Sequence, residues 1–284
     1  MASKPNVAAG YLPATVQVVR AANLYIATTL GDLRDDYVIV GGLVPSLIVP
    51  QADSSAVRPP HVGTMDVDLG LAIGILNEQR YHELCERLRS AGFQPDVNEA
   101  GRTTNQRWRI IADGQTVTVD FLIPAAGKDD VGGRLRNLDE GLAAIITPGL
   151  ELAFQDRRLV TLTGVTLRHE QASREVWVCE AGAFTVLKAL AFDGRGENKD
   201  AYDLIYLLQN YGNGIVDVFQ RLQPLLNTPP AKKALAILER DFAGVDSLGP
   251  MRAAEFLGNQ QDETIRADAA GAVRSLLGLC GKAS

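Results

Sequence analysis

The sequence is poor in the residues from which several common kinds of site are built. Its 284 residues include three cysteines and three histidines, and the cysteines Cys85, Cys179 and Cys280 follow no metal-ligand spacing. Neither a disulfide framework nor a zinc site is therefore expected. No apolar run approaches the roughly 20 residues that span a bilayer, and the first residues lack the basic and apolar regions of a signal peptide. We therefore expect a folded, cytoplasmic protein.

An excess of positive charge is also missing. The formal net charge is -6 and the sequence pI is about 5.2, which argues against broad, non-specific binding to nucleic acid. A local basic cleft for RNA or a nucleotide stays compatible with these values. The hydrophobic content of 46% is ample for a core, in one large domain or two modest ones.

The stretch from His61 to Leu69, with the sequence HVGTMDVDL, carries the main chemical signal. As a strand it places Asp66 and Asp68 side by side on one face. Two such carboxylates repel each other, and a divalent cation between them removes that cost. Mg²⁺ suits oxygen ligands of this kind, together with substrate phosphates. An Asp-x-Asp pair alone is more typical of a solvated strand face.

Two further stretches predict other strands of the same sheet. Residues 37–40 predict a buried strand that ends at Gly41 and Gly42, where the backbone can pass close to another group. Residues 107–111 and 115–123 flank Asp113-Gly114, a dipeptide favoured in two-residue hairpin turns. In the second of these strands Asp120 lies on the face opposite the apolar residues.

Other features of the N-terminal part have more ordinary interpretations. Residues 50–60 predict a loop, and residues 127–141 predict a surface connection with no strand in it. Asn77 is the expected N-cap of the following helix. Arg107 and Arg109 lie in the strand that pairs with Asp120, and at least one of them is expected to be an exposed charge.

The C-terminal part reads as helices. In the first, from about Gly182, Lys188 shares the apolar stripe. Its ammonium either reaches water past an apolar surface or contacts carboxylates or a phosphate. A second helix, capped by Asn198, carries Lys199, Asp200 and Asp203; a surface ion pair between Lys199 and Asp203 is the simplest interpretation.

These motifs together resemble a known family. The blocks VGG at 40–42, GTMDVDL at 63–69, VDFL at 119–122 and the later FxxxKAxA with KDAYDL are similar to the motifs of the AbiEii/AbiGii-type nucleotidyltransferase toxins, in the DNA polymerase β-like nucleotidyltransferase superfamily. The resemblance covers residues 37–211. Asp66 follows Gly42 by 24 positions (66 − 42), longer than is usual in the superfamily, which leaves the role of Ser46 open.

The resemblance implies roles for individual residues. It implies that the three aspartates hold Mg²⁺ or Mn²⁺ and that Lys188 contacts phosphate. It also implies a family-specific motif completed by Asp203. The residues carried over as catalytic are Asp66, Asp68, Asp120, Lys188 and Asp203, and those carried over as nucleotide-binding are Gly41, Gly42, Ser46, Thr64, Lys188, Lys199 and Asp200.

The function implied is transfer of a nucleotide from an NTP to an acceptor, with RNA such as tRNA as the acceptor and an antitoxin protein as the partner of a type IV pair. Two alternatives stay open, namely a module that binds GTP or another NTP without turnover, and an enzyme that modifies a small molecule such as an antibiotic. The expected fold is α+β, with a mixed-sheet core over residues 1–180 and a helical subdomain over residues 181–284 that completes the active site.

Overall fold

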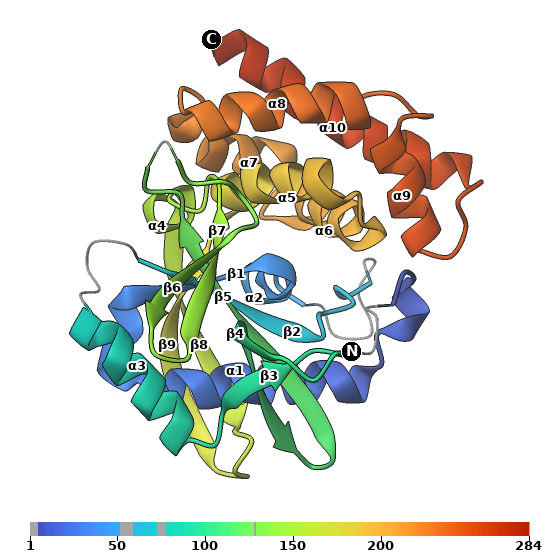
Figure 1. The fold of residues 1–284 in the computed structure, drawn as a ribbon. Coiled ribbons are helices and arrows are strands. Elements are labelled where there is room, and N and C mark those ends of the chain that lie inside the picture. Colours follow the sequence, from blue (N-terminus) through green and yellow to red (C-terminus); the bar gives the residue numbers. More distant parts are fainter. Residues whose placement is uncertain (1–4, 52–58, 73–77, 128, 284) are drawn as a thin grey trace. The chain divides into compact units, whose positions relative to one another are not determined.

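The computed structural model describes residues 5–51, 59–72, 78–127 and 129–283. The chain forms two compact units (Figure 1). The first contains Leu12–Leu43 and Thr64–Cys179, and the second contains Lys4–Tyr11, Val44–Gly63 and Glu180–Ser284. The second unit thus combines two N-terminal segments with the C-terminal helices.

A mixed β-sheet forms the centre of the first unit, and the predicted α+β fold class is confirmed. The described residues contribute nine strands, of which seven follow the order β3-β4-β5-β2-β1-β9-β8, while β7 pairs with β5 and β6 pairs with β7. Their bounds are β1 Tyr37–Val40, β2 Asp66–Leu71, β3 Gln94–Val97, β4 Thr103–Ala112, β5 Gln115–Pro124, β6 Leu135–Asp139, β7 Leu142–Thr147, β8 Arg157–Val165 and β9 Gln171–Cys179.

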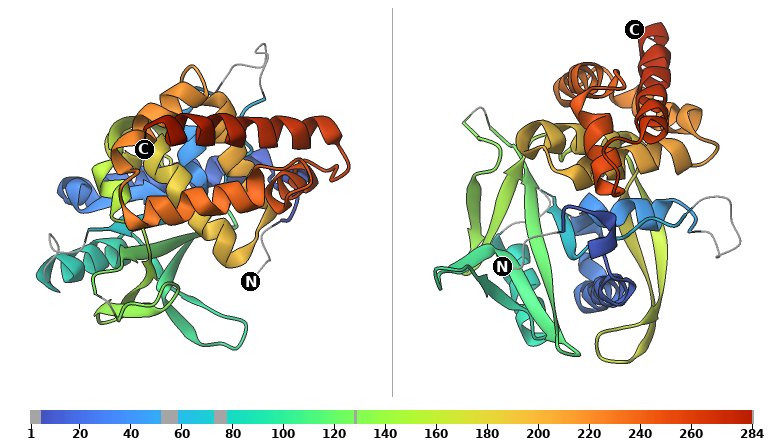
Figure 2. Two further views of the ribbon diagram at one scale, coloured as in Figure 1. Left: turned by 90° about the horizontal axis from the view of Figure 1, so that it is seen from above. Right: turned by 90° about the vertical axis from the view of Figure 1, so that its right-hand side faces the viewer.

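A local sequence signal accounts for one of the strand pairs. The strands β4 and β5 pair antiparallel around Asp113 and Gly114, whose φ values of 50° and 74° are those of a tight hairpin turn, so the predicted hairpin is confirmed. The strands β8 and β9 also pair antiparallel. Figure 2 shows β8 and β9 as a long ribbon in yellow-green.

The helix α1, Pro13–Leu30, packs against β2, β5, β8 and β9 and so covers part of the sheet. Pro13 is its first residue, and Gly31 is its C-cap. The helix α3, Glu78–Ser90, packs against α1 and β6, and Cys85 is fully buried in it. The proposed cap of α3, Asn77, lies outside the described residues. The remaining helices of this unit are short: η2 Gly31–Asp36, η3 Gly41–Leu43 and α4 Leu152–Gln155.

One expectation about this unit is wrong. Residues 127–141 do not form a connection without regular structure, because β6 lies within them and pairs antiparallel with β7. Arg136 lies in β6 and forms an ion pair with Asp130, so its guanidinium is neutralised within the chain. The strand β7 in turn extends the sheet beside the end of β5.

Helices make up the second unit. Their bounds are η1 Ala8–Gly10, α2 Val44–Ile48, α5 Ala181–Arg195, α6 Asn198–Asn210, α7 Ile215–Leu222, η4 Gln223–Leu225, α8 Pro229–Phe242, α9 Leu248–Phe256 and α10 Glu263–Ala283. The helices α5 and α6 pack against each other and are covered by α7, α8 and α9, coloured amber to red in Figure 1. The cap of α6 is Glu197, so the expectation that Asn198 caps this helix is wrong by one residue. No described helix has the length and apolar character required to cross a membrane.

Candidate functional site

The carboxylates of Asp66, Asp68 and Asp120 converge on one face of the sheet. The strands β2 and β5 are parallel neighbours, with Asp68 directly opposite Asp120, and Asp66 lies two residues earlier on the same face. One oxygen of each carboxylate can be chosen so that all three lie within 4.8 Å of one another. Asp66 and Asp120 are buried, so water does little to screen their repulsion.

Gly41 lies against this group of carboxylates. It begins the short helix η3 directly after β1, with φ of 73°, a left-handed conformation that favours glycine. A Cβ atom on Gly41 would lie 1.8 Å from Asp68 Oδ2. The absence of a side chain at this position is therefore what allows the Asp68 carboxylate to occupy its place.

Arg107 forms a fork with the third carboxylate. Its Nε donates to Asp120 Oδ1 at 2.6 Å and its Nη2 donates to Oδ2 at 2.5 Å. These bonds, together with the nearby Asp66 and Asp68, raise the pKa of the Arg107 guanidinium even though its burial acts the other way. Arg109 in turn lies 3.5 Å from Asp96. The side chains of Arg107 and Arg109 are only 24% and 31% exposed, so the expectation that at least one of them is an exposed charge is wrong.

The donor set suits a hard divalent cation such as Mg²⁺ or Mn²⁺. Three carboxylates of one sheet face supply oxygen ligands, and their mutual repulsion is a cost that a cation would remove. The guanidinium of Arg107 already neutralises one of the three charges, that of Asp120. Asp66 and Asp68 would hold the ion. Asp120 would be the third ligand, with its oxygens contacting both the ion and Arg107.

Three further predicted residues lie close to these in sequence. The hydroxyl of Thr64 donates to Asp66 Oδ1 at 2.9 Å, so Thr64 orients a carboxylate. Gly42 is buried in η3, beside Gly41. Ser46 is buried in α2 and belongs to the second unit.

The predicted residues of the C-terminal part are buried together and form an ionic cluster with Arg195, whose side chain is 48% exposed. The ionic cluster consists of Lys188, Arg195, Lys199, Asp200 and Asp203. Lys188 Nζ lies 2.8 Å from Asp200 Oδ1 and 2.8 Å from Asp203 Oδ2. Lys199 donates to Asp203 Oδ1, and Arg195 bonds both oxygens of Asp200 at 2.6 and 2.8 Å. All five residues come from α5 and α6, so two consecutive helices build the ionic cluster.

Lys188 and Lys199 are both buried, which bears on the interpretation of each. Lys188 is 5% exposed and Asp203 is fully buried, so the lysine ammonium contacts carboxylates and does not reach water. Lys199 is 8% exposed, which makes the interpretation of Lys199 and Asp203 as a surface ion pair wrong. Arg195 also lies 3.7 Å from Glu197, so the three cations of the ionic cluster face three carboxylates.

The pKa values follow this arrangement. Burial alone would raise the pKa of Asp200, but Lys188 and Arg195 outweigh it and lower that pKa to about 2. The pKa of Asp203 is likewise held well below its usual range by Lys188 and Lys199 against the effect of burial. Burial, reinforced by the charge of Lys188, lowers the pKa of Lys199 although Asp203 acts in the opposite direction.

His61 also belongs to this site, although no sequence motif identified it as a site residue. Its Nε2 lies 2.9 Å from Asp203 Oδ1. The backbone N–H of Gly63 donates to its Nδ1 at 3.1 Å, which leaves the proton on Nε2 and makes this nitrogen the donor to Asp203. The partner of His61 lies 142 residues away along the chain, and no local pattern identifies such a pair.

Aromatic rings enclose the imidazole. The ring of Tyr202 stacks on His61 with centroids 5.3 Å apart, and Tyr206 meets it edge-on at 4.9 Å. Burial, together with the charge of Lys199, lowers the pKa of His61 to about 4, against the effect of Asp203. The imidazole is therefore neutral at pH 7.

The predicted site residues thus form two groups. Gly41, Gly42, Thr64 and the three aspartates belong to the first unit, whereas Ser46 and the ionic cluster belong to the second, as does His61. Comparison of the chain with models of known protein families and with curated proteins finds no match.

Proposed function

We propose that the protein is a metal-dependent nucleotidyltransferase that moves a nucleotide from an NTP to an acceptor. The observation that carries this proposal is the convergence of three carboxylates from two parallel neighbouring strands, with oxygens within 4.8 Å of one another. Such a group suits Mg²⁺ or Mn²⁺, which when bound would stabilise the charge that develops on the attacking and leaving oxygens.

The motif resemblance adds the finer parts of the proposal. It supports RNA, such as tRNA, as the acceptor and a role as the toxin of a type IV pair, with a cognate antitoxin protein as partner. It also supports a cytoplasmic site of action, where NTP and RNA are both present.

The residues of the first unit have distinct tasks in this reaction. An acceptor hydroxyl attacks the α-phosphorus, the bond between the α- and β-phosphates breaks, and pyrophosphate leaves. Asp120 takes the proton of the hydroxyl. Arg107 orients Asp120 through its two hydrogen bonds, and Thr64 and Gly41 keep Asp66 and Asp68 in place.

The ionic cluster of the second unit supports binding of phosphate. It gathers the cations of Lys188, Lys199 and Arg195 around Asp200 and Asp203, and a group of cations attracts an anionic ligand. Lys188 and Lys199 are the residues proposed to meet the phosphates. Asp200 and Asp203 hold the two lysines in position, and Asp203 in turn accepts a hydrogen bond from His61.

A specific observation favours a second candidate, a module that binds an NTP without turnover. The Arg107 fork occupies both oxygens of Asp120, and a carboxylate engaged in this way is a poor base and a poor ligand. This candidate requires tight NTP binding in which Asp120→Asn has no effect. The acidic pI of about 5.2 favours a third, transfer to a small molecule.

Transfer of label tests these proposals against one another. Wild-type protein would be incubated with each α-³²P-labelled NTP, Mg²⁺ or Mn²⁺ and total bacterial RNA, and the products separated by size. We expect label in RNA, and its loss in Asp120→Asn. Label on a small molecule would select the third candidate, and NTP binding with no label in any product would select the second.

The matched control for Asp120→Asn is Asp96→Asn. Asp96 is also a buried aspartate beside an arginine of β4, namely Arg109 at 3.5 Å, but it is not one of the three converging carboxylates. Asp96→Asn should retain transfer. Equal loss in both variants would assign the effect to the β4 arginines and the fold, and would remove the support for Asp120 as the base.

A further inference from the structure

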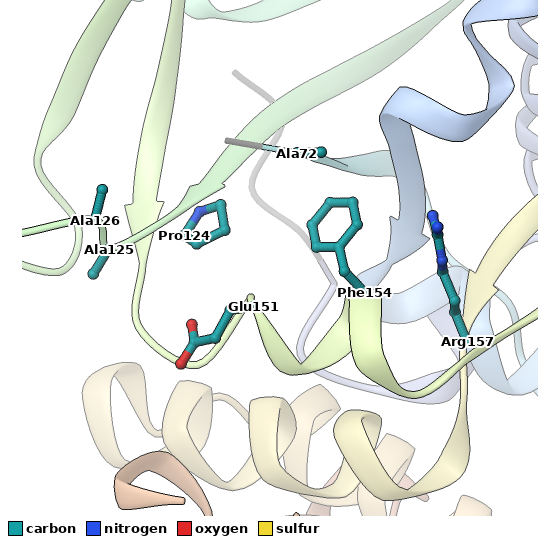
Figure 3. A pocket seen from close by; sticks show the side chains of 7 residues that line it. All are labelled: Ala72, Pro124, Ala125, Ala126, Glu151, Phe154 and Arg157. Atoms are coloured by element: carbon teal, nitrogen blue, oxygen red, sulfur yellow. The ribbon is translucent and has the colours of Figure 1, made fainter. Parts of the chain in front are cut away.

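A pocket of about 470 Å³ lies in the first unit and is lined by residues that the proposed reaction does not use. Ala72, Pro124 and Phe154 provide apolar walls, and Glu151 and Arg157 provide one charge of each sign (Figure 3). Pro124 follows Asp120 by four residues in β5, a separation of about 13 Å along a strand. The pocket is therefore a different place on the sheet from the three carboxylates.

Arg157 lacks the kind of partner that other arginines of this unit have. Arg34 pairs with Glu175 and Arg136 with Asp130. The Arg157 side chain makes no hydrogen bond or ion pair within the described ranges, and its Nη1 is buried without a hydrogen-bond partner. It is the only terminal guanidinium nitrogen among the described residues in that state. A buried donor without a partner costs stability, so this arginine is retained at a cost.

Two aromatic rings hold the guanidinium in place. The Cζ atom of Arg157 lies 4.3 Å from the centroid of the Trp177 ring and 5.6 Å from that of Phe154. Trp177 is fixed in turn by a 2.6 Å hydrogen bond from Nε1 to Asp35. Burial lowers the pKa of Arg157, and the charge of Asp35 only partly offsets this. Stacking thus fixes the direction of the cation while leaving its hydrogen-bonding capacity unused.

Glu151 is the second unused charge of the pocket. Its carboxylate makes no hydrogen bond or ion pair within the described part of the chain, and it does not pair with Arg157. In Figure 3 the side chains of Phe154 and Arg157 extend in the same direction, whereas the Glu151 carboxylate points away from them. The lining therefore offers a flat apolar ring with a hydrogen-bond donor beside it, and a separate hydrogen-bond acceptor.

We propose that this pocket binds a nucleobase. The base would stack on Phe154 and present an acceptor edge, with its ring nitrogen or carbonyl oxygen, to Arg157. It would present an N–H edge to Glu151. Every nucleobase has a flat face with acceptors and N–H donors on its edges, and proteins recognise unpaired bases by this combination of stacking and edge contacts. The proposal does not depend on the nucleotidyltransferase activity.

Trp177 provides a local reporter for binding. It contacts Arg157, whereas Trp108, the other tryptophan of the chain, is fully buried in β4. The four ribonucleosides would be titrated into the full chain carrying Trp108→Phe, with EDTA present, and the remaining fluorescence followed. Nucleosides carry no phosphate and EDTA removes divalent ions, so binding at the three carboxylates does not contribute. Calorimetry on the protein with Trp108 intact provides a second measurement that needs no change in the core.

We expect saturable binding of at least one ribonucleoside, weakened at least tenfold by Arg157→Gln and by Phe154→Ala. Arg174→Gln, a change of an exposed arginine in β9, and Asp66→Asn should both leave the affinity unchanged. Absence of binding by all four nucleosides at millimolar concentration would overturn the proposal. So would an affinity that Arg157→Gln does not alter, or equal binding of phenylalanine, whose zwitterion has both charges but no base edge.

A purely structural role for Arg157 makes a different prediction. If stacking on Trp177 were its only task, Arg157→Gln would lower the melting temperature of the ligand-free protein. Our proposal requires the opposite, an equal or higher melting temperature, because the substitution removes a desolvated cation. Loss of nucleoside binding together with retained thermal stability would support the pocket, and a fall in stability without any change in binding would overturn it.

Discussion

The backbone of Gly41 and the carboxylate of Asp68 occupy adjoining space, so that a Cβ atom on Gly41 would lie 1.8 Å from Asp68 Oδ2. Gly41 lies in η3 and Asp68 lies in β2, and these two elements pack against each other. The glycine is thus tied to the position of one carboxylate, and through it to the proposed metal ligands.

Gly41→Ala should therefore remove the metal site. The added methyl group must displace the Asp68 carboxylate, and the φ of 73° adds backbone strain of about 1 kcal/mol. We expect the affinity for Mn²⁺, measured by electron paramagnetic resonance of the free ion, to fall at least tenfold. Gly114→Ala is the matched control, because Gly114 has φ of 74° and nothing within 4 Å of the position of a Cβ. Equal loss of Mn²⁺ affinity in both variants would contradict the role of the contact.

Arg107 and a divalent ion should compete for Asp120. Arg107→Met leaves a carboxylate that is 8% exposed without its fork, which should destabilise the metal-free protein by about 1 to 3 kcal/mol. Mn²⁺ should restore more stability to this variant than to wild type, because the ion then provides the only compensating charge. Melting temperatures with and without Mn²⁺ measure the difference.

Arg109→Met is the control for that comparison, since Arg109 lies beside Asp96 at 3.5 Å and not beside the three converging carboxylates. Its response to Mn²⁺ should equal that of wild type. If Arg107→Met also responded like wild type, Asp120 would not be a metal ligand.

The ionic cluster of the second unit should be important for folding whatever it binds. Lys188→Met leaves Asp200 and Asp203 buried with one cation fewer, which should cost about 3 to 5 kcal/mol in the free energy of unfolding. Lys233→Met removes a lysine that is 64% exposed and lies 3.1 Å from Asp193, and it should cost less than about 1 kcal/mol. Urea denaturation of the two variants measures both values. Similar values for the two would contradict the burial of Lys188.

Features set by neighbouring residues could be predicted from the sequence. The Asp113-Gly114 hairpin follows from a turn whose two residues favour positive φ. The alternation of residues in β5 placed Asp120 on the face opposite the apolar side chains. The pair Lys199 and Asp203 follows from their i,i+4 spacing on one helix, although their burial does not, because it depends on helices that come later in the chain.

Features set by distant residues could not be predicted. The strand β6 lies in a stretch rich in charged residues and glycine. It pairs with β7 in a register that depends on the remainder of the sheet. The Arg107 fork depends on the antiparallel register that places Arg107 opposite Asp120. His61 has no ligand-like neighbour in sequence, and its partner Asp203 is identified only when the second unit is folded.

His61 should make the stability of the protein depend on pH in a defined range. The imidazole is fully buried against Asp203, Lys199, Lys188, Tyr202 and Tyr206, and its pKa is lowered from 6.5 to about 4 in the folded protein. The unfolded chain therefore binds a proton between these pH values that the folded protein does not bind. Stability is complete above pH 6.5 and falls as the pH decreases toward 4, by about 3 kcal/mol in total.

Denaturation by urea at a series of pH values from 4 to 6.5 measures this slope. His61→Gln retains an amide N–H for Asp203 and an oxygen for the Gly63 N–H, but it does not titrate, so the slope should decrease by up to one proton. A His61→Gln protein with the wild-type slope would show that another group causes the acid sensitivity.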